Sequence, residues 1–344
     1  MELDNPNIDS IPPEDRNRWL VSALRNQITY VSSQLPYWKE RLSNADVDAK
    51  KIESLTDFAQ IPVLSKQDFR ALKPTSLIPP ESLVKLKVSR WTSGTTGQPT
   101  ASFWTDNDWA ALVASTYRML KRQAPMQLPV AFNAFSQGHV TGPLFNAALR
   151  SLGAVVYDRS HHPEDLFSTF DQSELFDFDT LALPEKTARG KGVGLIDLLE
   201  RDPKYIARHK LRWWFGSSGT FSTDTIGRAK DQGLEVVSNL YGSSEFAPFG
   251  ISCPDNHGDY HINQGHVYAE IVNRSGQPVK NGESGWIVVS HLRGLEKNGE
   301  ACVHEGTQIL RLAAGDGATY LEEACTCGLT TPRFRDIKRL ETAP

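Results

Sequence analysis

The sequence predicts an α/β fold with mostly parallel sheets and flanking helices, followed by a smaller antiparallel β unit. Up to about residue 251, short apolar runs typical of buried strands alternate with helical patterns, which indicates a parallel sheet covered on both faces. After about residue 252 the runs become short and alternating and are broken by Gly, Asn and Pro, which favours antiparallel strands. The 344 residues suffice for one large domain or two.

Hydrophobic spacing predicts each element in turn. Apolar residues at helical spacing over 16–42 indicate an amphipathic helical entry segment, interrupted by Pro36. The same spacing predicts helices over residues 55–60, 66–72, 106–122 and 142–151. Strands are expected over residues 154–157, 211–215 and 236–240, and alternating strands over 266–272, 285–291 and 308–312.

Composition and charge exclude several classes of protein. The 37 Lys and Arg against 41 Asp and Glu give a net charge of −4, which supplies no global attraction to nucleic acid or anionic lipid. No apolar stretch approaches the roughly 18 residues of a membrane span, and the acidic start lacks the features of a signal peptide. We therefore predict a cytoplasmic protein with neither nucleic acid nor membrane as a partner.

Residues 91–100 carry the clearest chemical signal. Hydroxyl groups of Thr92, Ser93, Thr95 and Thr96 surround Gly94 and Gly97. Glycine lets the backbone approach an anion, and the N–H groups and hydroxyls can donate hydrogen bonds to phosphate oxygens. The segment therefore predicts a polyphosphate-binding loop, although no Gly-Lys-Ser/Thr closes it as in a Walker motif.

The order of these residues resembles the phosphate loop of the adenylate-forming superfamily, whose members activate carboxylic acids as acyl-AMP. Thr100 stands where most branches have Lys, which resembles the phenylacetate-CoA ligase branch. From about Trp19 to Lys338, further segments agree in order: 35–41, 61–66, 215–219, 241–245 and 315–316. The resemblance implies the large N-terminal domain of these enzymes, with ATP and Mg²⁺ as cofactors.

The resemblance also implies residue roles. Tyr241 would pack on the adenine, Ser243 would contact the α-phosphate, and Glu245 would hold Mg²⁺, an ion that usually takes few carboxylates and keeps several waters. Asp316 would accept hydrogen bonds from the ribose hydroxyls, and Arg335 would contact the ribose. The implied catalytic residues are Ser243 and Glu245, and the implied nucleotide-binding residues are Thr92, Ser93, Gly94, Thr95, Thr96, Gly97, Gly216, Ser217, Tyr241, Gly242, Asp316 and Arg335. Without the resemblance, residues 241–245 read as a tight turn and 315–317 as a hairpin turn.

The end of the strand before Gly216 is expected to form a wall of the adenine and acid pocket, because open α/β sheets bind ligands at strand C-termini. The resemblance implies that residues 132–139 lie near the carboxylic-acid pocket. The resemblance implies substrate contacts from Phe135, His139 and Gly216, and the aromatic side chains would suit an aryl acid. A core position for Phe135 and a loop role for His139 are the alternatives.

Three of the four cysteines predict a metal site. Cys325 and Cys327 lie one residue apart, and thiolate with imidazole is the ligand set that structural Zn²⁺ prefers. Some phenylacetate-CoA ligase relatives carry an early Cys, a strand His and a late Cys-x-Cys-Gly, which implies Cys253, His261, Cys325 and Cys327 as zinc ligands. His257 is the alternative to His261, and Cys302 has no partner in this pattern.

The resemblance implies four regions: a helical segment at 1–75, an α/β nucleotide-binding core at 76–251, a β-rich subdomain at 252–333 and a truncated hinge at 334–344. Full-length ligases continue beyond this hinge into a small domain with a catalytic lysine, so we expect that domain to be absent and to act in trans as a separate protein. A compact mechanism resembling that of the luminescence acyl-protein synthetases is the other route, but it needs a late cysteine as acyl acceptor.

The leading interpretation is an ATP- and Mg²⁺-dependent enzyme that adenylates a small carboxylic acid. The acyl group of the resulting acyl-AMP would then pass to CoA, a carrier-protein thiol or an amine. The alternative is a non-catalytic protein that binds a nucleotide or acyl-adenylate. A purely structural zinc protein would leave residues 92–97 unexplained.

Overall fold

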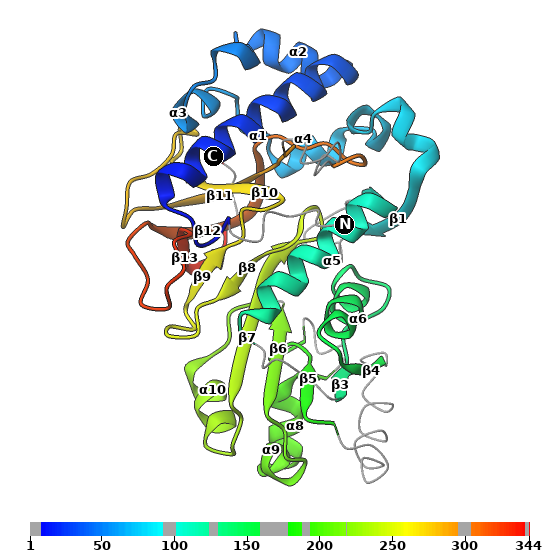
Figure 1. The fold of residues 1–344 in the computed structure, drawn as a ribbon, viewed down its shortest axis with the longest axis vertical. Coiled ribbons are helices and arrows are strands. Elements are labelled where there is room, and N and C mark those ends of the chain that lie inside the picture. Colours follow the sequence, from blue (N-terminus) through cyan, green and yellow to red (C-terminus); the bar gives the residue numbers. More distant parts are fainter. Residues whose placement is uncertain are drawn as a thin grey trace. The chain divides into compact units, whose positions relative to one another are not determined.

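The computed structural model describes residues 8–91, 101–123, 130–158, 178–187, 193–217, 219–294, 304–340 and 344. The chain divides into two compact units, which are treated one by one (Figure 1). The first unit comprises residues 1–115, 243–246 and 261–344, and the second comprises 116–242 and 247–260.

The described α-helices are α1 (Pro13–Gln34), α2 (Pro36–Asn44), α3 (Leu55–Phe58), α4 (Lys66–Ala71), α5 (Asp106–Lys121), α6 (Thr141–Ser151), α8 (Leu195–Arg201), α9 (Tyr205–Arg208) and α10 (Thr223–Lys230). The described strands are β1 (Leu86–Trp91), β2 (Ala101–Thr105), β3 (Val130–Asn133), β4 (Val155–Asp158), β5 (Thr180–Ala182), β6 (Trp213–Ser217), β7 (Val236–Ser243), β8 (Ala247–Ser252), β9 (Asp259–Ile262), β10 (Val267–Val272), β11 (Ser284–His291), β12 (Leu312–Leu321) and β13 (Arg333–Arg339).

Helices α1 and α2 confirm the predicted entry segment and its interruption. Leu35, which precedes Pro36, has an extended backbone with φ −125° and ψ 110°, as expected because a following proline disfavours the helical conformation. Pro36 then occupies the first position of α2, where its missing N–H costs nothing. None of the helices in the described ranges is long and apolar enough to cross a membrane.

The second unit contains the predicted parallel sheet. Its strands follow the order β8-β7-β6-β5-β3-β4, and β4, β3, β5, β6 and β7 pair in parallel with their neighbours in this series. The strands expected at 154–157, 211–215 and 236–240 correspond to β4, β6 and β7. Strands β3 and β5 are also parallel members of this sheet, and the sequence did not predict them.

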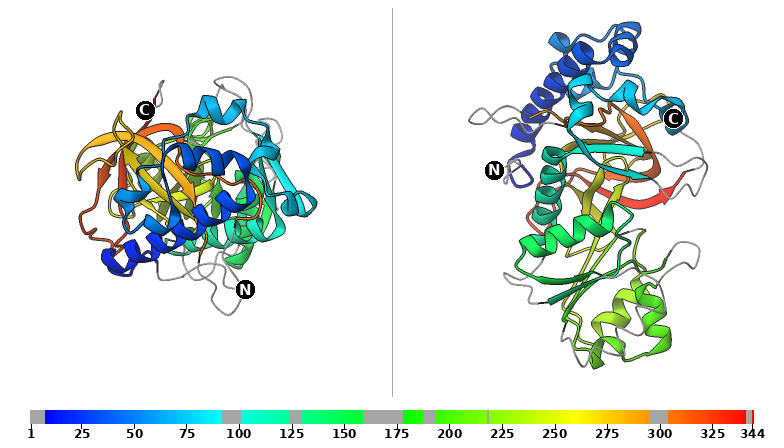
Figure 2. Two further views of the ribbon diagram at one scale, coloured as in Figure 1. Left: turned by 90° about the horizontal axis from the view of Figure 1, so that it is seen from above. Right: turned by 90° about the vertical axis from the view of Figure 1, so that its right-hand side faces the viewer.

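Helices cover both faces of these parallel strands (Figure 2). Phe132, Leu181 and Trp214 belong to one apolar cluster together with residues of α8, α9 and α10. Their sequence neighbours Ala131, Ala182 and Trp213 belong to a second cluster with residues of α6 and the end of α5. Because successive strand residues point to opposite faces, the two clusters are the two covered faces that the sequence predicted.

The first unit contains the predicted antiparallel strands. Strands β10, β11, β12 and β13 are neighbours in this order, and each strand pairs with the next in the antiparallel direction. Strands β1 and β2 form a separate antiparallel pair, in which Trp91 is opposite Ala101. Strand β2 precedes α5, which corresponds to the helix predicted over residues 106–122.

One predicted strand is wrong. Residues 308–311 are not part of a strand, and β12 begins only at Leu312. Arg311 has φ 46°, which is incompatible with an extended strand. The carbonyl of Gln308 accepts a hydrogen bond from the Trp38 indole at 3.1 Å, and the Arg311 N–H donates to Ser290 Oγ at 2.8 Å. In addition, the Gln308 N–H donates to the Leu77 carbonyl, and the Arg311 carbonyl accepts from the Leu64 N–H. Contacts with several separate segments therefore replace the regular ladder that the alternating pattern suggested.

Candidate functional site

The predicted phosphate-binding residues Thr92, Ser93, Gly94, Thr95, Thr96 and Gly97 lie outside the described residues, as does Thr100. The described chain places Trp91 at the end of β1 and Ala101 at the start of β2. Their role in holding a polyphosphate stays a prediction.

Ser243 and Glu245 lie at the turn that connects β7 to β8. This turn is closed by a hydrogen bond from the Phe246 N–H to the Ser243 carbonyl at 3.2 Å. The Glu245 side chain is 1% exposed, and within the described chain neither its Oε1 nor Ser243 Oγ has a hydrogen-bond partner. Buried polar atoms normally have partners, so these two oxygens have the property expected of groups that meet a ligand.

Lys66 supplies a positive charge beside Glu245. Its Nζ lies 3.3 Å from Glu245 Oε1, a contact that is an ion pair but does not have hydrogen-bond geometry. Nζ also donates to the Ala314 carbonyl at 3.3 Å. Lys66 is the first residue of α4, whose N-cap Ser65 accepts a hydrogen bond from the Asp68 N–H. The ammonium therefore approaches both the candidate metal carboxylate and the strand that carries Asp316.

The sequence reasoning missed Lys66. Residues 61–66 matched the family in order, but no role was assigned to their lysine. Its proximity to Glu245 depends on how α4 packs within the first unit, where α4 also contacts β12. The sequence signal that could have identified Lys66 is the presence of a lysine within a segment that matches the family in order.

Asp316 lies within β12 and not at a hairpin turn, so the turn alternative is wrong. Its Oδ1 accepts a hydrogen bond from Arg339 Nη1 at 3.0 Å, and its side chain is 18% exposed. Arg335 lies on β13 opposite Thr319. Both residues are thus on paired strands of the first unit, and their contacts with a ribose stay predictions.

In the second unit, Tyr241 stands at the end of β7 among other aromatic rings. Its ring is edge-on to Phe249 at 5.2 Å and to Tyr260 at 6.1 Å between centroids. A Cβ on the adjacent Gly242 would lie 2.3 Å from the Ala247 carbonyl oxygen. Because that atom belongs to the backbone, no side chain fits at residue 242, and glycine permits the close approach of β7 and β8.

Gly216 and Ser217 are the last two residues of β6, at the strand C-terminus where the sequence predicted the pocket wall. A Cβ on Gly216 would lie 2.0 Å from Phe221 Cζ, and the Phe221 ring stacks on Trp214 at 3.9 Å. Gly216 therefore makes room for an aromatic ring of this chain. Its role toward a substrate stays a prediction.

The candidate acid-pocket residues differ in burial. Phe135 is 6% exposed and stacks on Phe145 with centroids 4.9 Å apart, so it contributes to the core, as the alternative reading expected. His139 is half-buried, and its Nδ1 lies 3.1 Å from Thr141 Oγ1. Neither observation tests contact with a carboxylic acid.

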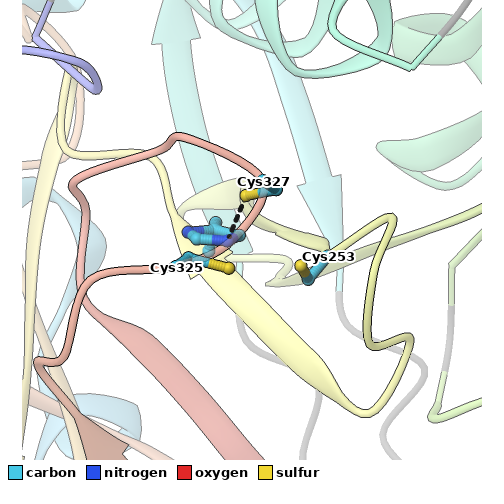
Figure 3. A group of neighbouring side chains, drawn as sticks. Cys253, Cys325 and Cys327 are labelled. Atoms are coloured by element: carbon cyan, nitrogen blue, oxygen red, sulfur yellow. Dashed lines mark hydrogen bonds between the residues drawn. The ribbon is translucent and has the colours of Figure 1, made fainter.

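The four predicted zinc ligands lie together. The ligand atoms of Cys253, His261, Cys325 and Cys327 are all within 4.8 Å of one another, and Figure 3 shows the three labelled cysteines turned toward a common centre. Within the described residues, none of these cysteines forms a disulfide bond. Cys327 Sγ lies 3.1 Å from His261 Nε2. Three thiolates and one imidazole are a donor set that fits structural Zn²⁺.

Neighbouring groups orient this donor set. His261 Nδ1 lies 3.2 Å from Thr331 Oγ1. This contact occupies Nδ1 and orients Nε2 toward the cysteines. Gly328 has φ 84°, and its N–H donates to the Cys325 carbonyl at 3.0 Å, so glycine closes the turn that carries both late cysteines.

The alternative ligand His257 instead has its Nε2 3.1 Å from Lys230 Nζ. Burial and the Lys230 charge both lower the pKa of His257.

Comparison with known proteins identifies relatives of this chain. No protein-family model matches it. The phenylacetate-coenzyme A ligase of Thermus thermophilus is 28% identical over 352 residues, covering 96% of this chain and 72% of the relative. The enzymes of the same name from Pseudomonas putida and Escherichia coli are each 27% identical, and the chain spans 61% of the length of either.

Solved structures show the same fold. A 2-hydroxyisobutyryl-CoA ligase in complex with 2-HIB-AMP and CoA superposes with a TM-score of 0.81 at 18% identity, covering 96% of this chain and 76% of that one. An amide bond synthetase from Marinactinospora thermotolerans gives a TM-score of 0.51 at 18% identity, covering 74% of this chain and 49% of that one. The fold is that of the large N-terminal domain of adenylate-forming enzymes. Within that superfamily, the chain is a homologue of the phenylacetate-CoA ligases.

Proposed function

We propose that the protein catalyses the ATP- and Mg²⁺-dependent adenylation of a small carboxylic acid. In this reaction a carboxylate oxygen forms a bond to the α-phosphorus of ATP, the bond from that phosphorus to the bridging oxygen breaks, and pyrophosphate leaves with the electron pair. The observation that carries the proposal is the pair of buried oxygens of Ser243 and Glu245, which lack hydrogen-bond partners within the described residues, at one turn of a phenylacetate-CoA ligase homologue. Glu245 would hold Mg²⁺, which would neutralise charge on the phosphate oxygens.

The other residues would bind and orient the nucleotide. Ser243 Oγ would donate a hydrogen bond to the α-phosphate, and Lys66 would offset negative charge beside Glu245. Tyr241 would pack on the adenine, and Asp316 would accept hydrogen bonds from the ribose hydroxyls. Residues 92–97 would surround the polyphosphate. Positioning and electrostatic stabilisation of this kind supply most of the rate in phosphoryl chemistry.

The proposed acid is aromatic, and the proposed acceptor is CoA. Both follow from the names of the curated relatives, which are phenylacetate-coenzyme A ligases. A carrier-protein thiol or an amine is the other acceptor class.

A second candidate is a non-catalytic protein that binds a nucleotide or an acyl-adenylate. The observation that favours it is the ion pair between Lys66 and Glu245, because an internal cation can replace a metal ion in a protein that needs no chemistry.

Pyrophosphate release tests the two candidates. Wild type, Glu245→Gln and the exposed control Glu53→Gln are assayed with ATP and Mg²⁺ against a panel of aryl and aliphatic acids. The assay is run with and without the separately produced C-terminal domain of the Thermus thermophilus relative. Acid-dependent release that Glu245→Gln reduces at least 100-fold, while Glu53→Gln does not, supports adenylation. Saturable ATP binding without release under any condition rejects the enzyme and leaves the binding protein.

We also propose that Cys253, His261, Cys325 and Cys327 hold a structural Zn²⁺ ion. Because four protein ligands complete a tetrahedral site, the ion would stabilise the fold and do no chemistry. Metal analysis of the purified protein tests this directly. We expect about one zinc per chain, lost in Cys327→Ser and retained in Cys302→Ser, whose cysteine is not one of the four proposed ligands. Equal zinc content in both variants rejects the site.

A further inference from the structure

We propose that Asn263, Ser115 and His266 form a buried relay that positions the turn carrying Ser243 and Glu245. The inference rests on the proposed function, since it assigns these three side chains to the support of the metal carboxylate. All of the residues involved belong to the first unit. None of the three is among the residues that the sequence singled out.

The relay is continuous in hydrogen-bonding distances. Asn263 Nδ2 donates to Ser115 Oγ at 2.7 Å. Ser115 Oγ lies 2.9 Å from His266 Nδ1, and His266 Nε2 lies 3.3 Å from the Phe246 carbonyl oxygen. Phe246 directly follows Glu245, so the last contact of the relay acts on the backbone of the candidate metal carboxylate.

The chemistry of the end groups determines the direction of each hydrogen bond. A carbonyl oxygen can only accept, so His266 must carry its proton on Nε2 in order to donate to Phe246. In a neutral imidazole Nδ1 is then an acceptor, which receives the Ser115 hydroxyl proton. The Ser115 oxygen in turn accepts from the Asn263 amide. Each group therefore has one role, and the relay defines one tautomer of His266.

Burial and flanking contacts limit the freedom of the relay. Ser115, Asn263 and His266 are 1%, 0% and 3% exposed. His304 Nε2 lies 3.1 Å from the backbone carbonyl of His266, and the Phe246 ring packs edge-on to His291 at 5.1 Å.

Both sides of Phe246 are thus fixed: its N–H closes the turn to Ser243, and its carbonyl receives the relay. A carboxylate that must meet a metal and a phosphate depends on such support. Groups around metal ligands typically change affinity by 10- to 100-fold when removed, and a misplacement of about 1 Å can cost about 100-fold in rate. Removing the Ser115 hydroxyl leaves His266 Nδ1 without its donor and allows the ring to rotate or change tautomer. The expected consequence is a displaced Glu245 and a weaker metal site in an otherwise folded protein.

The experiment measures the binding of Mn²⁺, a paramagnetic substitute for Mg²⁺, by electron paramagnetic resonance in the presence of ATP. It compares the wild-type chain, Glu245→Gln, Ser115→Ala, Ser115→Thr and Ser82→Ala. Ser82 is a matched control because it is 1% exposed in the same unit and belongs neither to the relay nor to the proposed nucleotide site. ATP binding in EDTA is measured in parallel, together with the melting temperature.

We expect Ser115→Ala to weaken Mn²⁺ binding about tenfold, with ATP affinity in EDTA unchanged and with Ser82→Ala like the wild type. Ser115→Thr, which retains the hydroxyl, should recover most of the affinity. If Ser115→Ala and Ser82→Ala bind Mn²⁺ equally, or if Ser115→Ala changes only the melting temperature, the relay is rejected while the proposed function stands. If the wild type and Glu245→Gln bind Mn²⁺ alike, the metal role of Glu245 fails, and the relay fails with it.

Discussion

The second unit buries apolar side chains on both faces of its parallel strands, whereas the first unit buries many more charged residues and histidines. Two apolar clusters lie on the two faces of the second unit, and Asp259 is the charged residue that it buries within the described chain. The first unit buries an ionisable set, each 5% exposed or less: Asp9, Arg16, Asp108, Glu245, His261, His266, Glu270, His291, His304 and Arg311. An apolar core is stabilised by area and packing, but a buried charge depends on its partner. The first unit should therefore respond more strongly to loss of a partner, to pH and to metal.

Arg311 offers the largest expected effect. Its guanidinium donates to both carboxylate oxygens of Glu270, at 2.8 and 3.3 Å, and to the carbonyls of Ala59, Ile61 and Gly276. Burial raises the pKa of Glu270, and Arg311 opposes that rise. Arg311→Met leaves Glu270 buried without its partner and should cost about 3–5 kcal/mol in the free energy of unfolding. Urea denaturation measures this cost, and the double variant with Glu270→Leu should recover part of it. A cost below about 1 kcal/mol would remove the distinction between the units.

Leu181 tests the apolar unit. It is fully buried in β5 within the first apolar cluster, so Leu181→Ala should cost about 3 kcal/mol through lost transfer energy and a cavity. The truncation Val155→Ala in the same unit, at a side chain that is 58% exposed, should change stability by less than about 0.5 kcal/mol. Urea denaturation measures the free energy of unfolding of both variants. Comparable losses at the two sites would show that burial does not determine the stability of this unit.

Acidification should destabilise the first unit. Burial lowers the pKa of His291, and the neighbouring His304 and His266 lower it further. Burial also lowers the pKa of His304, against the opposing charge of Asp108. A histidine with a lowered folded pKa is neutral in the native state but binds a proton in the unfolded chain below about pH 6.5. Stability is therefore complete above that pH and is lost as the pH falls, by up to about 1.4 kcal/mol per histidine per pH unit.

We expect His291 to contribute a loss of up to about 2 kcal/mol between pH 7 and pH 5, measured by urea denaturation at each pH. The variant His291→Asn should flatten this dependence because asparagine does not titrate. An unchanged pH slope would mean that His291 contributes nothing to it.

Thr331 offers the smallest expected effect. Its Oγ1 lies 3.2 Å from His261 Nδ1, the contact that directs Nε2 toward the cysteines. Thr331→Val keeps the shape but removes the hydroxyl, and zinc affinity should fall roughly tenfold, or about 1.4 kcal/mol. Competition with a fluorescent chelator measures the affinity. Thr326→Val, between the two late cysteines, provides a control that keeps all four ligands.

The sequence predicted the second unit well where local patterns determine structure. Strands β4, β6 and β7 are continuous apolar runs, and α6 follows helical spacing. The predicted strand at 308–312 failed because Arg311 uses its backbone and guanidinium for contacts with residues far away in the chain. A pattern of apolar alternation contains no information on such partners.

The candidate site was only partly predictable for the same reason. The cysteine spacing and the choice of His261 over His257 agree with the observed cluster, because the family resemblance supplied the ligand set. The approach of Lys66 to Glu245, and the relay from Asn263 to Phe246, join segments that are distant in the sequence. Single buried Ser, Asn or His residues have no periodicity, so only the fold reveals what they contact.

The pairing of Lys66 with Glu245 has a consequence for how a metal ion would bind. The carboxylate already has a counter-ion within the chain, so a divalent cation arriving with a nucleotide would enter by exchange and not by simple addition. Displacement of the ammonium would free it to turn toward the incoming phosphates. The Glu245 carboxylate would have a cation beside it at each stage. The dependence of binding on salt should therefore be weaker than the formal charges of metal and carboxylate suggest.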